Sequence, residues 1–198
     1  MLELVTPHGT AGAHLLPVES PVAGLVLGHG AGGGVETPDL VGAAEAARSG
    51  GLAVALVEQP YRVAGRRSPA PARQLDVAWI SVVRQLGAQA FAGLPILTGG
   101  RSSGARVACR TAAETGSVAV VCLAFPLHPP GRPEQSRLAE LDAVRVATLV
   151  VQGDNDPFGM PPPAANRTVT GIPGTHALRS SAAVAAAVSS WLTMVALR

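Results

Sequence analysis

Two glycines flank a pair of serines in residues 100–104, Gly-Arg-Ser-Ser-Gly, which follow a short apolar run. The spacing fits G-x-S-x-G, a strand-to-helix turn that lifts a serine hydroxyl clear of a sheet. Glycines flank this serine because the strained turn brings neighbouring backbone so close that a Cβ would clash. Ser103 lacks the flanking pair, since Arg101 and Ala105 occupy its corresponding positions. Ser102 is therefore the candidate nucleophile.

Two aspartates and one histidine later in the chain could activate this serine. A serine is a strong nucleophile only when a base accepts its proton and a carboxylate orients that base. Asp154 and Asp156 both follow an apolar run; either fits this role, and both also fit an ordinary turn. His176 comes after the last weak strand and gives the chain order Ser, Asp, His that is typical of this turn. His176 is therefore the candidate base.

A glycine-rich segment, residues 28–34, follows the apolar run 23–27 and reads Gly-His-Gly-Ala-Gly-Gly-Gly. Such a turn leaves backbone N–H groups free to face a developing alkoxide. The same glycines match the dinucleotide pattern G-x-G-x-x-G formally. However, no acidic residue closes a second strand about 20 residues on, and Glu58 comes late. We therefore favour an oxyanion-binding turn over a nucleotide-binding loop.

The composition indicates a compact globular protein. At 198 residues, 47% hydrophobic and 14% charged, the sequence predicts a single domain over residues 1–198. A net charge of +2 with 3% aromatic residues argues against a nucleic-acid partner. Cys109 and Cys122 fall in apolar segments and are expected to be buried free thiols.

Neither end of the sequence predicts a membrane or export segment. The first residues lack the basic region and long apolar core of a signal peptide. The run 182–197 is mostly alanine and is better explained as a packed helix than as a membrane span. We therefore expect a cytoplasmic protein with no membrane partner.

Apolar runs alternate with helix-favouring segments along the whole chain, with no repeat and no linker. This alternation predicts a mainly parallel sheet with helices on both faces, with ligands at the carboxyl ends of the strands. Residues 62–71 are expected to form a basic loop, and the first two strands are expected at the sheet edge. The expected strands are 2–6, 13–18, 23–27, 52–57, 94–98, 118–124, 146–151 and 167–172, and the expected helices are 38–49 after a Thr37 cap, 72–86, one after Ser102, 134–141 and the C-terminal run.

The chain resembles the α/β-hydrolase superfamily over nearly its whole length. It is most similar to the small lid-less branch that includes dienelactone-hydrolase-like proteins and the hydrolase-like subunit of a chromatin acetyltransferase complex. The matching segments are 29–32, 100–104, 125–130, 152–159 and 174–176.

The resemblance implies an α/β-hydrolase fold with no lid domain, and it implies roles for several residues. The family's acid usually lies three residues after the glycine that ends its strand, which favours Asp156 over Asp154. The backbone N–H groups of Ala31 and Ser103 would form the oxyanion hole. Many relatives have methionine at Ser103, and dienelactone hydrolases proper have cysteine at Ser102, which weakens the case for their particular substrate.

The predicted function is a serine hydrolase that cleaves a small acyl ester or thioester through an acyl-enzyme, without cofactor or metal. About twenty residues lie between the strands ending at 124 and starting at 146, too few for a helical lid. The site should therefore be open. Arg62, Arg66 and Arg67 could attract an anionic substrate, but a solvated loop is the better explanation of these residues. The expected pocket-lining residues are His29, Tyr61, Leu127, Phe158 and Met160.

Two alternatives stay open. A catalytically silent hydrolase-like scaffold fits the resemblance to the chromatin-complex subunit, but the retained Ser, Asp and His argue against it. Non-hydrolytic chemistry on the same fold is the other alternative.

Overall fold

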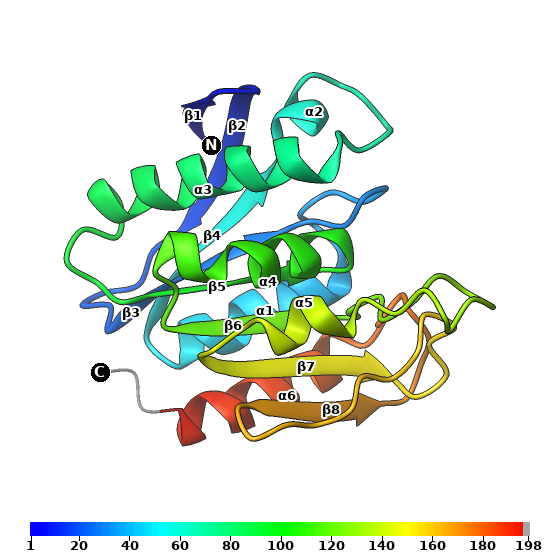
Figure 1. The fold of residues 1–198 in the computed structure, drawn as a ribbon. Helices are drawn as coiled ribbons and strands as arrows, with labels where there is room; N and C mark the ends of the chain where they lie inside the picture. The colour runs from blue at the N-terminus through cyan, green and yellow to red at the C-terminus, as the bar shows by residue number, and fades with distance from the viewer. Residues whose placement is uncertain (196–198) are drawn as a thin grey trace.

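Eight strands form one sheet in the computed structural model, which describes residues 1–195 of the chain. Their spatial order is β1-β2-β4-β3-β5-β6-β7-β8 (Figure 1). Strands from β4 to β8 pair in parallel, whereas β1 and β2 run antiparallel to their neighbours. The predicted mainly parallel sheet is thus confirmed. The strands are β1 (Leu2–Thr6), β2 (Gly9–Leu16), β3 (Ala23–Gly28), β4 (Leu52–Glu58), β5 (Ile96–Arg101), β6 (Ala119–Leu123), β7 (Ala147–Gly153) and β8 (Arg167–Ile172).

Helices cover both faces of this sheet, as the alternation predicts (Figure 1). One face packs against α1 (Pro38–Ser49) and α6 (Ser181–Met194), which share a core cluster with the strands. The other face packs against α3 (Ala72–Ala88), α4 (Ser103–Thr115) and α5 (Leu138–Asp142). Because both faces are covered, the central strands read as unbroken apolar runs and are buried throughout.

Several local expectations were wrong. β2 lies between β1 and β4, so only β1 forms that edge of the sheet, and β8 forms the other. The short helix α2 (Pro60–Val63) occupies the start of the expected loop. Thr37 precedes α1, but its hydroxyl makes no capping bond and is buried without a partner among the described residues. The end of the predicted C-terminal helix, at Leu197, lies outside the described residues.

The connection from β6 to β7 is short and contains only the five-residue helix α5. No lid domain rises above the carboxyl edge of the sheet there, in agreement with the prediction. Within residues 1–195, no helix combines the length and hydropathy needed to cross a bilayer.

Helices α1 and α6 touch at Gly42, where a Cβ would overlap the backbone carbonyl of Ser181. α1 follows the glycine-rich turn, and α6 follows the segment that carries His176. The contact at Gly42 therefore sets how closely these two functional segments approach each other.

We expect Gly42→Ala to destabilise the fold. Helix propensity alone would favour alanine by about 1 kcal/mol, but overlap with a backbone carbonyl should cost about 1–3 kcal/mol. Gly87→Ala in α3 is the matched control, because its Cβ would meet only Cδ1 of Ile96, at 3.1 Å, which can rotate away. Urea unfolding should show loss of stability for Gly42→Ala and none for Gly87→Ala. Equal shifts in the two variants would contradict the close-contact explanation.

Candidate active site

Ser102 lies in a strained turn between β5 and α4, with φ 52° and ψ −109°. Its N–H donates to the carbonyl of Leu123 at the end of β6 (2.9 Å). Cβ atoms at Gly100 or Gly104 would run into the carbonyl oxygen of Gly28 in β3. The flanking glycines are thus needed for close backbone approach. Ser102, which the motif selects, is also one of four non-glycine residues with positive φ among the described residues.

The structure brings Ser102, His176 and Asp156 together. Ser102 Oγ lies 2.9 Å from His176 Nε2, and His176 Nδ1 lies 2.9 Å from Asp156 Oδ2. A carboxylate can only accept, so Nδ1–H donates to Asp156 and Nε2 is left to accept the serine hydroxyl. In this arrangement the imidazole can take the serine proton.

Asp156 is held by two further donors besides His176. Its Oδ2 accepts from Gln152 Nε2 (2.8 Å), and its Oδ1 accepts from the N–H of Phe158 (2.8 Å). Its side chain is only 1% exposed. Asp154, the other aspartate that the spacing allowed, is exposed and lies beside Gly171 of β8. Only Asp156 of the two is bonded to the histidine.

The residues expected to line a pocket lie in different surroundings. The Phe158 ring packs on the imidazole of His176, with 4.2 Å between ring centroids and a 34° tilt. Leu127 packs against the core beneath α5. Met160 is 42% exposed beside β8.

His29 and Tyr61, the other two expected pocket residues, brace the glycine-rich turn. His29 is 3% exposed; its Nδ1–H donates to the carbonyl of Gly30 (2.7 Å), and its Nε2 accepts the N–H of Gln59 (3.1 Å). Tyr61 Oη donates to the carbonyl of Ala31 (3.0 Å). Burial lowers the pKa of His29 and so favours the neutral ring that this pattern requires.

The N–H groups of Ala31 and Ser103 have no protein partner among the described residues. The turn lies against Ser102, because a Cβ on Gly30 would stand 3.6 Å from the serine Cβ. Free N–H groups beside a nucleophile can stabilise an oxyanion.

Residues 21–178 match the family described as "Alpha/beta hydrolase domain". The chain belongs to this family. A sequence search of curated proteins finds no relative.

Solved structures with a similar fold align with nearly the whole of this chain. A lid-less α/β serine hydrolase from Xanthomonas campestris is 21% identical with a TM-score of 0.76, and 98% of this chain aligns with 93% of that one. Est1E from Butyrivibrio proteoclasticus, solved with ferulic acid bound, is 17% identical with a TM-score of 0.80, and 98% of each chain is covered. A dienelactone hydrolase from Anabaena variabilis is 20% identical with a TM-score of 0.75, and 100% of this chain aligns with 97% of that one. At these identities the likeness establishes the α/β-hydrolase fold.

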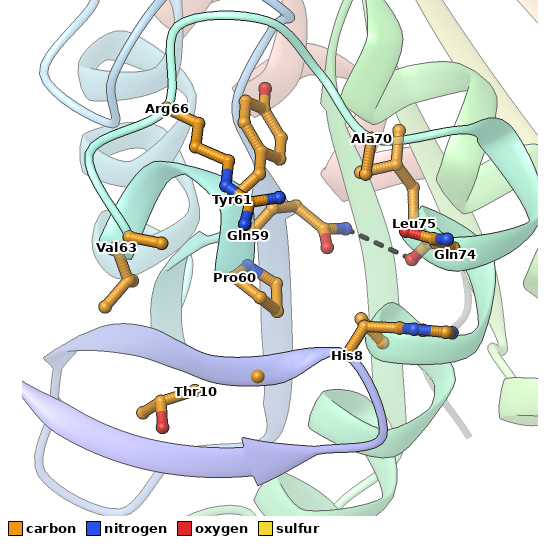
Figure 2. A pocket seen from close by; sticks show the side chains of 13 residues that line it. His8, Thr10, Gln59, Pro60, Tyr61, Val63, Arg66, Ala70, Gln74 and Leu75 are labelled. Atoms are coloured by element: carbon orange, nitrogen blue, oxygen red, sulfur yellow. Dashed lines mark hydrogen bonds between the residues drawn. The ribbon is translucent and has the colours of Figure 1, made fainter.

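A hollow of about 440 Å³ lies on the far side of Tyr61 from the serine turn of this hydrolase. It is bounded by the β1–β2 turn, α2 and the start of α3 (Figure 2). Arg66 lines it, but neither Ser102 nor His176 does. Ser102 and His176 lie outside this hollow at the carboxyl edge of the sheet, where both are partly exposed. In the described part of the chain, no three His, Cys, Asp or Glu side chains gather as metal ligands would.

Sequence reasoning missed three supporting side chains of the hydrolase site. Gln152 is fully buried and its Nε2 bonds Asp156, and the signal for it is a polar residue inside an apolar strand. Arg101 and Asp39 form a buried ion pair behind the serine, and no local pattern predicts a pair so far apart in the chain.

The lowered pKa of His29 predicts an acid-sensitive fold. The unfolded chain takes up this proton near pH 6.5 and the folded protein only at lower pH. Stability should therefore be lost as pH falls below about 6.5, by at most about 1.4 kcal/mol per pH unit from this group. Above that pH the group contributes no pH dependence.

His29→Gln tests this assignment, because a glutamine oxygen can still accept the Gln59 N–H but does not titrate. Urea unfolding of both proteins between about pH 7.5 and about pH 5.5 gives the stability difference at each pH. The wild type should lose more stability than the variant on acidification. A difference that stays constant with pH would show that His29 is not held neutral.

Proposed function

We propose that this protein is a serine hydrolase that cleaves a small acyl ester or thioester through an acyl-enzyme intermediate. The observation that carries the proposal is the continuous chain of hydrogen bonds from Ser102 through His176 to Asp156. A strained serine at the head of that chain supports the same reading, since backbone strain concentrates at functional sites.

In the proposed reaction, Ser102 Oγ attacks the carbonyl carbon while His176 Nε2 accepts its proton. The N–H groups of Ala31 and Ser103 stabilise the negative charge on the carbonyl oxygen, each worth about 3 kcal/mol of barrier. When the intermediate collapses, the alcohol or thiol leaves with the proton from His176. Water, deprotonated by the same nitrogen, then attacks the acyl-serine. The acid is released as His176 returns that proton to Ser102 Oγ. Asp156 stays ionised and stabilises the imidazolium.

A small substrate is supported by the open site and by the short β6–β7 connection. The described connection from β6 to β7 contains a single helix, the five-residue α5, and so has no helical lid that could enclose a long acyl chain. The neighbours in structure include a hydrolase without a lid, a protein with bound ferulic acid and a dienelactone hydrolase. These names support a carboxylic ester as substrate class for this chain. We propose a cytoplasmic location for the enzyme.

A catalytically silent scaffold is the second candidate, suggested by the resemblance to a chromatin-complex subunit. The hydrogen-bonded triad disfavours it, because a scaffold gains nothing from keeping a strained serine bonded to a histidine. Covalent labelling separates the two candidates.

We expect a fluorophosphonate probe to add once to the wild type and not at all to Ser102→Ala, as read by intact mass. Ser103→Ala is the matched control, because Ser103 is assigned only a backbone N–H and alanine keeps it. This control should label like the wild type. Absence of an adduct on folded wild type would refute the acyl-enzyme mechanism and favour the scaffold.

We expect kcat/KM for p-nitrophenyl esters to be highest for acetate or butyrate and to fall with longer chains. An open site offers extra methylene groups little apolar surface to bury, whereas full burial would gain about 0.8 kcal/mol per CH₂. A stopped assay over the C2 to C12 series measures this trend. Rising kcat/KM up to long chains would contradict an open site.

A further inference from the structure

Arg101, the residue before the serine, reaches three parts of the site at once. Its Nε donates to Asp39 Oδ2 (2.8 Å), and its Nη2 donates to the backbone carbonyl of His176 (3.1 Å). Its Nη1 lies against the glycine-rich turn, 2.8 Å from where a Cβ on Gly30 would stand. One guanidinium thus contacts the start of α1, the segment that carries His176 and the glycine-rich turn.

Asp39 anchors this arginine from the first turn of α1. Its side chain is completely buried, and its Oδ1 accepts the N–H of Leu40 (3.0 Å). Arg101 itself is 17% exposed in its side chain. A buried ion pair gains little over apolar residues of similar size. The pair therefore calls for an explanation other than stability.

We propose that Arg101, fixed by Asp39, is a positioning residue. It holds His176 at the correct distance from Ser102 and from the glycine-rich turn. The inference rests on the proposed function, because it assigns the arginine a role in that same reaction. It adds a residue that the G-x-S-x-G pattern leaves unspecified.

The histidine needs such support because it lies outside any helix or strand, between β8 and α6. Its ring is held by Asp156 and by the Phe158 ring. Within residues 1–195, its backbone makes one hydrogen bond, the one from Arg101 to its carbonyl. Without that bond the ring can turn about Asp156 and change the Nε2–Oγ distance.

The planar fork of arginine suits this task and lysine does not. A guanidinium donates in fixed directions to two or more acceptors, whereas an ammonium is a compact point charge. Arg101 uses separate nitrogens for Asp39 and for the His176 carbonyl. A lysine would keep the charge beside Asp39 and lose the geometry of the bridge.

The test compares kcat and KM for p-nitrophenyl acetate in three proteins. Arg101→Lys keeps the charge, and the double variant Arg101→Met with Asp39→Asn removes both charges, so that no buried carboxylate is left unpaired. Because a displacement of about 1 Å costs about 10²-fold in rate, we expect the double variant to lose about that factor in kcat. Arg101→Lys should lie in between. KM should change by less than about two-fold in both, because no substrate contact is removed.

The matched control is Arg110→Met with Asp76→Asn. Arg110 also sits in a partly buried ion pair, on α4, the helix that follows the serine turn, with Nη2 bonded to Asp76. This control should keep wild-type kcat. An unchanged kcat in the Arg101 variants, a rise in KM alone, or an equal loss of kcat in the control would overturn the proposal.

A second readout does not depend on turnover. The proton that His176 Nδ1 donates to Asp156 should give a low-field resonance in the wild-type NMR spectrum. We expect it to shift or broaden in the folded double variant and to stay unchanged in the Arg110 control. An unchanged resonance in the folded double variant would overturn the positioning role. Failure of the wild type to react with the fluorophosphonate would refute the hydrolase proposal. The NMR measurement would still test whether Arg101 positions His176, because it does not need turnover.

Discussion

The site depends on one close backbone contact, between the carbonyl oxygen of Gly28 at the end of β3 and the serine turn after β5. Gly100 and Gly104 lie so near this oxygen that neither position has room for a Cβ. β3 and β5 are adjacent and parallel, so their carboxyl ends meet at the same edge. The contact sets the glycine-rich turn directly beside Ser102, and with it the spacing between the nucleophile and the free N–H groups of Ala31 and Ser103.

Around this contact, side chains from three different elements of the fold hold the groups of the proposed site. Tyr61, after β4, fixes the carbonyl of Ala31. Gln152, within β7, fixes Asp156, and Arg101 at the end of β5 reaches the segment between β8 and α6. The loops therefore carry the chemistry while strand ends and helix starts fix their positions. Such preorganisation lets donors act without rearranging when charge develops.

The predictable part of this molecule is the part encoded over short stretches of chain. The sheet follows from apolar runs, and Ser102 follows from glycines two positions away. Spacing alone leaves Asp154 and Asp156 open as the acid. The family resemblance favours Asp156, and the structure bonds Asp156 to His176. The surroundings of the expected pocket-lining residues are likewise visible only in three dimensions. A residue type and a place near a strand end do not say whether a ring faces solvent or, like Phe158, packs on the imidazole of His176.

The ion pair of Asp39 and Arg101 lies beyond sequence reasoning because its partners are 62 positions apart and belong to two elements with no shared pattern. Its place in the fold explains why polar groups are used there. The carbonyl of His176 accepts from Arg101 at the point where α1, β5 and the histidine segment converge, and an apolar pair would remove this protein donor. The ion pair behind the serine provides a donor to this carbonyl and links α1, β5 and the histidine segment in one fixed arrangement. Specific arrangement, more than added stability, is therefore what the buried charges supply.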